Sequence, residues 1–401
     1  MENIILFDDD HWKSLLPLTF TKPIAELRVG ILTIAEKWKH RLGGKVSYIT
    51  QDYLADKFPI NISDNNLVIN ARLLPNDNIT DLIEQLDLNE ALLNDDILVA
   101  ARLNKEQFDK LIQGEDLDEL KGTDLKKHER YLHFIARPYD IFTENSAEIA
   151  KDYKILTHRK KSAQISYHNF PINPDSIYID PTAEVTFSSL NATDGPIYIG
   201  PGAKIMEGSH IRGPFALCES ATVKMGCKIY GGTTIGPHSK VGGELSNVVI
   251  QGYSNKGHDG YLGNSVIGEW CNLGADTNSS NLKNNYKEVK VWDYTAESFS
   301  PTGLQFCGLI MGDHSKSGIN TMFNTGTVVG VSANIYGSGF PRTYIPSYAW
   351  GGAAGYKTYR IEEAFETMAK VMERRGVTLS DKDKVILQNI YHETAANRNW
   401  E

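Results

Sequence analysis

The chain has 401 residues, of which 41% are hydrophobic and 23% are charged, so it is long enough for two or more domains with hydrophobic cores. Its formal net charge of −9 argues against general nucleic-acid binding, which needs a basic surface, although a local cluster of Lys and Arg can still bind an anionic small molecule. No apolar stretch approaches membrane-spanning length, and the N-terminus lacks the basic start and apolar run of a signal peptide. We therefore expect a cytoplasmic protein that binds neither nucleic acid nor membrane.

The first 150 residues alternate short apolar runs with helical patterns. This alternation predicts an α/β domain with a largely parallel sheet, which we place at residues 1–155. We expect strands at Ile4–Phe7, Val46–Ile49, Leu67–Asn70 and Ile97–Ala101, and helices at Ile24–His40 and Leu82–Leu93.

The next part of the chain has a strict six-residue period. Small residues stand two places before most of the aliphatic positions, and glycines often follow three places after them. This period fits neither a helix nor an alternating strand, but it is typical of a parallel β-helix in which each flat face is one short strand and one turn. The aliphatic series is Ile199, Ile205, Ile211, Leu217, Val223, Ile229, Ile235 and Val241.

The six-residue period is interrupted after Val241 and returns later in a second series, of which Ser317 is an imperfect member. Residues 276–306 are polar and too long for a turn, so we expect them to form a loop extruded from the β-helix. The four cysteines form no C-x-x-C pair, which favours buried, reduced thiols. They are Cys218, Cys227, Cys271 and Cys307.

Two helices are expected at the C-terminal end, from Tyr359 onward. The second should begin at a capping box formed by Ser380 and Asp383. Such helices would cover the open end of the solenoid, whose last coil is otherwise an unpaired edge. We place the β-helix at residues 156–355 and the helical segment at residues 356–401.

The interrupted coils carry a series of motifs at regular spacing. They resemble the acetyltransferase half of the bifunctional sugar-1-phosphate nucleotidyltransferase/N-acetyltransferases (GlmU-like enzymes), over residues 196–340. The resemblance implies a left-handed β-helix that assembles as a homotrimer, with acetyl-CoA as co-substrate bound between subunits. The motifs are Gly257-His258, Tyr261-Leu262-Gly263, Ile267-Gly268, Asn272-Leu273-Gly274-Ala275, Asn281-Leu282-Lys283, Lys287 with Lys290, and the segment from Gly312 to Asn320.

The resemblance assigns a role to each residue of these motifs. His258 is the general base that accepts a proton from the attacking amine of the sugar, as an imidazole can do near neutral pH. The backbone amide of Ala275 donates to the oxyanion. The sugar is bound by Tyr261, Asn272 and Asn281, and its phosphate or those of the acyl carrier are bound by Lys256, Lys287 and Lys290.

Simpler interpretations remain open for several of these residues. A loop histidine such as His258 can be a polar residue bonded to a carbonyl group, and Lys287 and Lys290 can form a solvated face. His314 and Lys316 can tie adjacent coils together. A zinc carbonic anhydrase is the alternative metal enzyme with this repeat, but the histidines here lack its close pair. No metal ligand is therefore assigned.

The N-terminal half resembles a short, divergent nucleotidyltransferase domain. In that family the domain transfers a nucleotidyl group from a nucleoside triphosphate to a sugar 1-phosphate, with Mg²⁺ as the expected cofactor. The candidates for nucleotide binding are Lys22, Arg28 and Asn70. The glycine-rich loop that cradles the triphosphate is absent, and Asp8-Asp9-Asp10 stands in its place.

Together these features predict a transferase of sugar-nucleotide biosynthesis. It would acetylate a hexosamine 1-phosphate and couple the product to UTP or another nucleoside triphosphate. Two alternatives stay open. In the first, the enzyme is a nucleotidyltransferase whose β-helix serves oligomerisation or regulation. In the second, the chain is a non-catalytic scaffold.

Overall fold

The computed structural model describes residues 2–95, 97–113, 121–124 and 132–400. It contains two compact units. The first, called the α/β unit, is built from the chain up to Leu15, Lys22–Leu27 and Leu32–Ala136. The second, called the β-helix unit, is built from Leu16–Thr21, Arg28–Ile31 and the chain from Arg137 onward. Residues 137–155, which the sequence analysis assigned to the first domain, thus belong to the β-helix unit.

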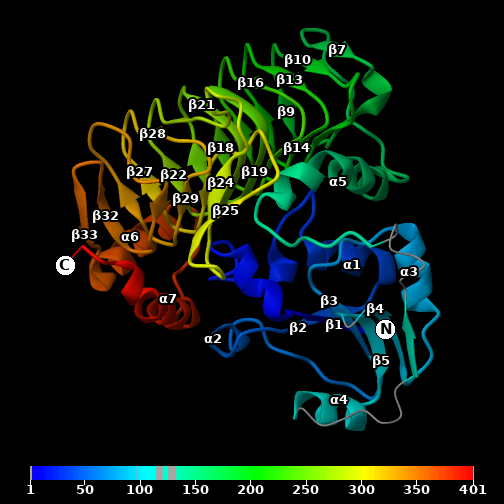
Figure 1. Ribbon diagram of the computed structural model, residues 1–401. Helices are drawn as coiled ribbons and strands as arrows, with labels where there is room; N and C mark the ends of the chain where they lie inside the picture. The colour runs from blue at the N-terminus through cyan, green and yellow to red at the C-terminus, as the bar shows by residue number, and fades with distance from the viewer. Residues whose placement is uncertain (1, 96, 114–120, 125–131, 401) are drawn as a thin grey trace. The chain divides into compact units, whose positions relative to one another are not determined.

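The α/β unit is built on a six-stranded sheet with the order β2-β1-β3-β5-β4-β6 (Figure 1). All four expected strands are present. Three of its five strand pairings are parallel, in keeping with the expected largely parallel sheet, but β5 runs antiparallel to both β3 and β4, so the sheet is mixed. Apolar runs report burial but not strand direction, and the sequence pattern therefore did not show this reversal. The strands are β1 (Asn3–Phe7), β2 (Lys45–Ile49), β3 (Asn66–Asn70), β4 (Glu90–Asn94), β5 (Ile97–Leu103) and β6 (Lys121–Asp124).

The helices of this unit are shorter than the sequence pattern suggested. Within the expected helix Ile24–His40, regular α-helix begins only at Ile34, behind a capping box of Thr33 and Glu36. The expected helix Leu82–Leu93 was wrong in its second half, which forms strand β4. The helices are the 3₁₀ segments at Asp10–Leu15 and Ile24–Glu26, and α1 (Ile34–Leu42), α2 (Asp52–Ala55), α3 (Asp77–Glu84) and α4 (Lys105–Ile112).

The β-helix unit confirms the six-residue repeat. Its coils stack as parallel strands in register, and the largest sheet has 13 strands (Figure 1). These are β7 (Phe170–Ile172), β8 (Ile177–Ile179), β10 (Ser189–Asn191), β11 (Ile197–Ile199), β13 (His210–Arg212), β14 (Phe215–Leu217), β16 (Lys228–Ile229), β17 (Thr233–Ile235), β19 (Glu244–Gly252), β21 (Tyr261–Glu269), β26 (Ile310–Met311), β29 (Val328–Val329) and β31 (Tyr344–Ile345).

A second, ten-stranded sheet forms another face of the coils and carries the segment with His258 at one of its corners. Most of its strands have two residues, because the chain turns at each corner of the coil. They are β9 (Glu184–Val185), β12 (Lys204–Ile205), β15 (Thr222–Val223), β18 (Lys240–Val241), β20 (Asn255–Lys256), β22 (Asn272–Leu273), β27 (Lys316–Ser317), β30 (Asn334–Ile335), β32 (Ala349–Gly352) and β33 (Gly355–Thr358).

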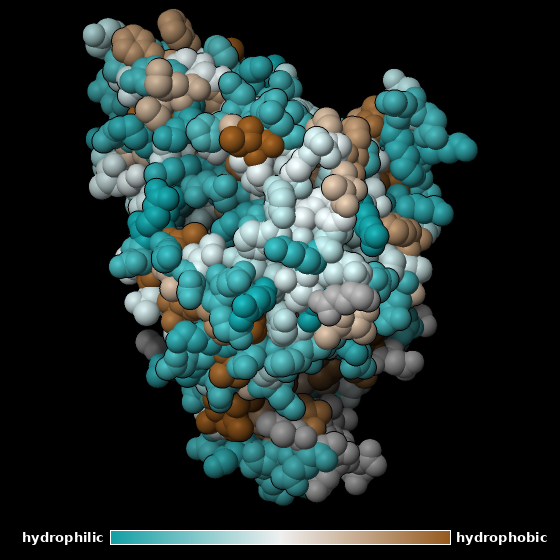
Figure 2. Space-filling view, turned by 90° about the vertical axis from the view of Figure 1, so that its left-hand side faces the viewer, coloured by the Kyte–Doolittle hydropathy of each residue, from teal (hydrophilic) through white to brown (hydrophobic). Residues whose placement is uncertain are grey.

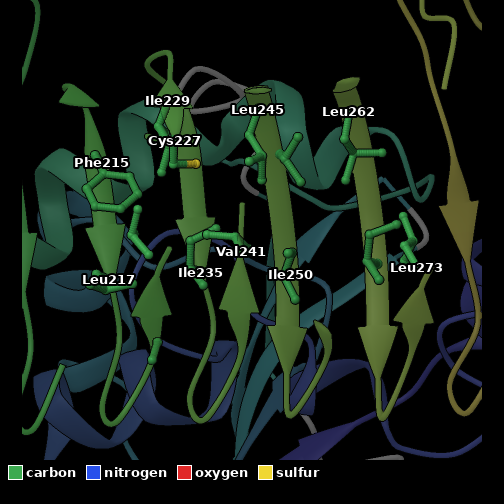
Figure 3. Close-up of a cluster of buried hydrophobic side chains, with 14 of the residues drawn as sticks. Phe215, Leu217, Cys227, Ile229, Ile235, Val241, Leu245, Ile250, Leu262 and Leu273 are labelled. Carbon is green, nitrogen blue, oxygen red and sulfur yellow. The ribbon is translucent and has the colours of Figure 1, made fainter. Parts of the chain in front are cut away.

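The aliphatic repeat residues form one continuous core inside the coils. Their side chains point toward one another from successive strands, as the labelled residues of Figure 3 show. Ser317 takes a core position as expected, paired with Leu273 and Ile335 and almost fully buried. All four cysteines are buried and unbridged. The core therefore depends on close stacking of identical positions rather than on covalent links.

The expected loop at residues 276–306 is partly ordered. It begins with β23 (Asn278–Ser279), which pairs with β28 (Met322–Phe323), and then forms an antiparallel hairpin of β24 (Lys290–Asp293) and β25 (Ser298–Pro301).

Three longer helices belong to the β-helix unit. They are α5 (Asp140–Thr157), α6 (Ile361–Glu373) and α7 (Asp381–Glu393), the last two of which confirm the expected C-terminal helices. Ser380 and Asp383 form the expected capping box at the start of α7.

The face of the molecule in Figure 2 is mainly hydrophilic, with hydrophobic residues scattered over it. Within the described residues, no helix is both long enough and apolar enough to cross a bilayer.

Candidate active site

His258 lies in the turn that follows β20 and is exposed to solvent. It lines two hollows of about 890 and 600 Å³. The two hollows share the residues Lys224, Gly257, His258 and Ala275, so the imidazole stands where they meet. This position leaves the ring able to contact ligands in either hollow.

The larger hollow, called the cationic cleft, concentrates positive charge. Burial lowers the pKa of Lys240, and the neighbouring charges of Arg375, Lys224 and Arg374 lower it further. Arg374 and Arg375 come from the end of α6 and are side by side with these lysines in the lining. Like charges held this closely repel one another, so an anion bound among them would be stabilised.

Aromatic rings form one wall of the cationic cleft. Tyr253 and Trp270 are stacked with ring centroids 4.2 Å apart, and His238 continues the stack beyond Tyr253 at 4.8 Å. These residues occupy the same corner of successive coils and share a left-handed backbone conformation, with φ between 52° and 61°. A planar, anionic ligand therefore finds both charge and a stacking surface in this cleft.

The smaller hollow has a different character. Asp259 and Asp276 contribute carboxylates to its lining, together with Gly242 and Gly243 of the preceding coil. Because carboxylates attract ammonium groups, this hollow is suited to an amine, whereas the cationic cleft is suited to phosphates.

Ala275 and Asn272 are brought together with His258, as the sequence motif implied. Asn272 lines the cationic cleft and Ala275 lines both hollows. The carbonyl oxygen of Ala275 accepts a hydrogen bond of 2.8 Å from the Asn320 amide. Its own N–H has no acceptor within the described part of the chain, so it is available to a ligand oxygen.

Lys256 is placed in the interior rather than in either hollow. Its side chain is 2% exposed, and its Nζ donates to the carbonyl oxygens of Gly242 (3.0 Å) and His258 (2.8 Å). Burial lowers the pKa of this lysine to about 8. With its ammonium group enclosed in this way, Lys256 is not positioned to bind a phosphate.

Tyr261 and Asn281 form a pair away from the two hollows. Asn281 Nδ2 donates to the Tyr261 hydroxyl at 3.0 Å and to Asn264 Oδ1 at 2.8 Å. Lys287 and Lys290 are exposed on the extruded segment, and neither is among the residues that line the hollows. In one copy of the chain, the residues proposed to bind the sugar and its phosphate thus lie only partly around His258.

Lys316, considered from the sequence as a structural residue, makes a structural contact and also lines the cationic cleft. Lys316 Nζ donates to the His314 carbonyl oxygen at 2.9 Å, which ties the coil together. Lys316 also lines the cationic cleft, where burial lowers its pKa.

In the α/β unit, the carboxyl ends of β1, β2 and β3 meet at one edge of the sheet. Asp9, which follows β1, accepts hydrogen bonds from the Arg72 guanidinium (2.6 to 2.9 Å) and from Asn70 Nδ2 (3.0 Å). Asp8 accepts from the Ile24 amide and from the Thr50 hydroxyl. Asn70 therefore lies at this edge, as expected.

The acidic residues at this edge do not offer a ready Mg²⁺ site. Both oxygens of Asp9 already accept from Arg72, and each oxygen of Asp8 has one donor. Burial raises the pKa of Asp8 to about 7, against the effect of its two hydrogen bonds. A carboxyl group whose charged form is disfavoured by burial, and another already paired with Arg72, do not suit a divalent cation. Within the described residues, no group of three or more His, Cys, Asp or Glu side chains is arranged to hold a metal ion.

The other two candidates for nucleotide binding are buried. Lys22 belongs to the α/β unit. Arg28 belongs to the β-helix unit, where its guanidinium donates to the carbonyl oxygens of Gln251 (3.3 Å) and Ile31. These contacts favour a structural role for Arg28, and its part in nucleotide binding stays a prediction.

We expect Arg72→Ala to lower the free energy of unfolding of the α/β unit by about 2 kcal/mol near pH 7, because the partly buried Asp9 would lose its cation. Burial acts to raise the pKa of Asp9, but the hydrogen bonds from Arg72 and Asn70 outweigh it, and the pKa is lowered overall. The stabilisation is thus present above pH 3.8 and is lost as the pH falls through the lower folded-state value. Urea unfolding followed at pH 7 and pH 3 would measure the effect, and an equal loss at both pH values would contradict it.

Sequence reasoning missed most of the cationic cleft. Each of the missed residues stands at an unremarkable outward position of a coil or at the end of α6, and only coil stacking gathers them. The one signal available was the recurrence of lysines beside core positions. The missed residues are Lys224, Lys240, Tyr253, Trp270, Arg374 and Arg375.

Comparisons with known proteins bear on both parts of the chain. Residues 4–161 match the family model described as sugar nucleotidyl transferase. The chain is 33% identical over 118 residues to the bifunctional protein GlmU of Methanocaldococcus jannaschii, which is 29% of this chain and 26% of that protein. It is 27% identical over 197 residues to GlmU of Rippkaea orientalis, covering 44% and 39%.

A third relative is the bifunctional sugar-1-phosphate nucleotidylyltransferase/acetyltransferase of Sulfurisphaera tokodaii, 38% identical over 93 residues, or 23% of each chain. The matched regions thus span between about a quarter and two fifths of these relatives. Through the family match at residues 4–161 and these relatives, the chain is similar to the bifunctional sugar-1-phosphate nucleotidyltransferase/acetyltransferases, the same resemblance that the motifs around His258 indicate.

Proposed function

We propose that the β-helix unit transfers an acetyl group from acetyl-CoA to the amine of a hexosamine 1-phosphate. The observation that carries this proposal is the position of the exposed His258, where a cationic, aromatic cleft meets a smaller hollow lined by carboxylates. One side suits a phosphorylated acyl carrier and the other an amino sugar. His258 would act as the base between them.

The acyl donor is assigned to the cationic cleft. Lys224, Lys240, Arg374 and Arg375 would bind the phosphates of acetyl-CoA, and the stacked rings of Tyr253 and Trp270 would offer an apolar surface beside them. These four residues take the phosphate-binding role that the sequence motif suggested for Lys256, because the ammonium group of Lys256 is enclosed.

The chemistry follows from the groups at the junction. The sugar nitrogen attacks the thioester carbonyl and forms the C–N bond while His258 accepts the proton of the amine. The Ala275 N–H donates to the carbonyl oxygen as it becomes an oxyanion, a contact worth about 3 kcal/mol. Collapse of the intermediate breaks the C–S bond, and the protonated His258 returns a proton to the departing thiolate.

The sugar-binding residues support assembly as a homotrimer. Tyr261, Asn281, Lys287 and Lys290 are not part of the lining of either hollow in their own subunit. In a trimer they could contribute to the hollow of a neighbouring copy. Sedimentation equilibrium should then give three times the chain mass of 44.7 kDa. A monomer at micromolar concentration would contradict this arrangement.

Nucleotidyl transfer by the α/β unit is the second proposed activity. The family match at residues 4–161 and the position of Asn70 at the strand edge favour transfer from UTP, or another nucleoside triphosphate, to the sugar 1-phosphate. Only the resemblance to the nucleotidyltransferase family supports a requirement for Mg²⁺. Both substrates are cytoplasmic metabolites, in keeping with the location expected from the sequence.

An assay with purified protein tests the proposed function. Glucosamine 1-phosphate, acetyl-CoA, UTP and Mg²⁺ are supplied, and thiol release and pyrophosphate release are followed separately. Thiol release that depends on the sugar supports acetyl transfer. Pyrophosphate release without thiol release favours a nucleotidyltransferase with a regulatory β-helix, and neither release, with no binding in calorimetry, favours a scaffold.

We expect Arg374→Ala to raise KM for acetyl-CoA about tenfold with little change in kcat. The guanidinium lines the cationic cleft, and an ionic contact to phosphate is worth on the order of 1–2 kcal/mol there. Steady-state kinetics at low and high salt would measure the effect, which should shrink as salt screens the charge. Lys370→Ala, an exposed position on the same helix, is the matched control. An unchanged KM for acetyl-CoA in Arg374→Ala would contradict the assignment of the acyl donor to the cationic cleft.

A further inference from the structure

Lys256 occupies a position that other coils give to an aliphatic residue. In the ten-stranded sheet it pairs with Val241, which in turn pairs with Val223, and both valines point into the core. A lysine at a core position is costly unless its ammonium group is hydrogen-bonded. The reason for a lysine here must lie in what the ammonium group binds.

The turn after Lys256 takes a different backbone path from the regular turns at this corner, although it keeps their spacing: Leu262 follows Lys256 after six positions, as Ile229 follows Val223. In the regular turns a residue with positive φ follows the core residue after three positions, as Gly226 follows Val223 and Asp276 follows Leu273. After Lys256 the residue with positive φ is Gly260, four positions on. The altered path falls in the segment that carries His258.

The coil below has the opposite irregularity. There Gly243 follows the core residue Val241 after only two positions. Because of this mismatch, the Gly260 amide does not make, within the described residues, the hydrogen bond that joins regular corners, such as Gly226 N–H to Glu207 O (3.0 Å).

Lys256 supplies the missing donors. Within the described residues, no backbone N–H donates to the carbonyl oxygens of Gly242 and His258, and both accept from Lys256 Nζ instead, at 3.0 and 2.8 Å. The Gly242 amide in turn donates to the Lys256 carbonyl oxygen at 2.7 Å. The ammonium group therefore connects the short turn after Val241, the turn that carries His258 and the core.

We propose that Lys256 is a positioning residue that fixes the His258 turn at the junction of the two hollows by donating to the carbonyl oxygens of Gly242 and His258. This inference rests on the proposed acetyl transfer, in which His258 must reach the amine of the sugar. Without the two hydrogen bonds, the turn is held between Lys256 and Gly260 only by the bond from the Asp276 amide to the Asp259 carbonyl oxygen, and the imidazole samples positions outside the reactive geometry. Displacements of about 1 Å cost on the order of 100-fold in rate.

Lys256→Met tests the inference, since methionine fills the core but donates no hydrogen bond. We expect kcat of acetyl transfer to fall 10- to 100-fold while KM for acetyl-CoA changes less than threefold, because the lining of the cationic cleft is intact. Amide hydrogen exchange should accelerate in the segment 257–261 and stay unchanged in distant coils. Lys228→Met, at an exposed lysine one residue before core residue Ile229, is the matched control and should resemble the wild type in both measurements.

Lys256→Gln, which keeps a shorter donor, is the second variant and should give intermediate kcat and intermediate exchange. If both variants keep kcat within twofold of the wild type, the inference is wrong although acetyl transfer stands. Loss of the fold in both variants also overturns it, because the lysine would then hold the whole coil rather than one turn. If the wild type does not transfer acetyl groups, the proposed function fails on its own, and unchanged exchange at 257–261 in Lys256→Met would separately refute the anchoring.

Discussion

His258→Ala should lower kcat of acetyl transfer about 1000-fold, with KM for acetyl-CoA changed less than threefold. General base catalysis contributes on the order of 100- to 10,000-fold, and the exposed imidazole at the junction of the two hollows is the group assigned to it. The cleft that binds the acyl donor keeps its charges in this variant. Thiol release from acetyl-CoA with glucosamine 1-phosphate as acceptor is the measurement.

His210→Ala is the control for this experiment, because His210 is another exposed histidine of the same solenoid, on β13. It should retain full activity. Pyrophosphate release from UTP should be unaffected in both variants, since the α/β unit is unaltered. A His258→Ala protein that still acetylates at a tenth or more of the wild-type rate would eliminate His258 as the base and with it the central assignment of the site.

Lys256→Met should change how the stability of the β-helix unit depends on pH. Burial lowers the folded-state pKa of Lys256 to about 8, against 10.5 in the unfolded chain, so the unfolded state binds more protons between these values. The wild type therefore gains stability as the pH rises through this window. Relative to Lys256→Met, the gain from pH 7 to pH 10 should be about 2 kcal/mol, measured by urea unfolding followed by circular dichroism.

The exposed Lys228 again gives the control, since Lys228→Met should follow the wild type at every pH. The difference between the two proteins isolates the contribution of Lys256, because their other ionisable groups are the same. Parallel curves for wild type and Lys256→Met would mean that the ammonium group is as well solvated in the folded state as in the unfolded one. The pair of hydrogen bonds to Gly242 and His258 would then not describe the protein in solution.

Several features of the site were predictable because they depend on residues close together in the sequence. The motif around Gly257-His258 and Asn272–Ala275 lies on two consecutive coils, so its members were expected to meet, and they do. The cationic cleft could not be found in this way. Lys224, Lys240 and Arg374 come from two other coils and a C-terminal helix, and only their packing makes them neighbours.

Lys256 shows the reverse case, in which the motif indicated the residue but not its environment. A lysine beside a catalytic motif suggests a phosphate ligand, whereas the repeat register places this side chain inside the core. The period was interrupted at this point, so counting by six did not reach Lys256. The shortened turn after Val241, where the core residue Leu245 follows after four positions instead of six, explains why.

What the sequence determined by itself was local and periodic. The six-residue repeat specified a parallel β-helix, because stacked coils bury identical positions and each coil needs only its neighbours. The capping box at Ser380 and the four strands of the α/β unit were equally local. Only the tertiary structure decided strand direction in the mixed sheet, the burial of Lys256 and the clustering of positive charge beside His258. These features depend on which distant segments pack together, and no single stretch of residues determines the free energy of that packing.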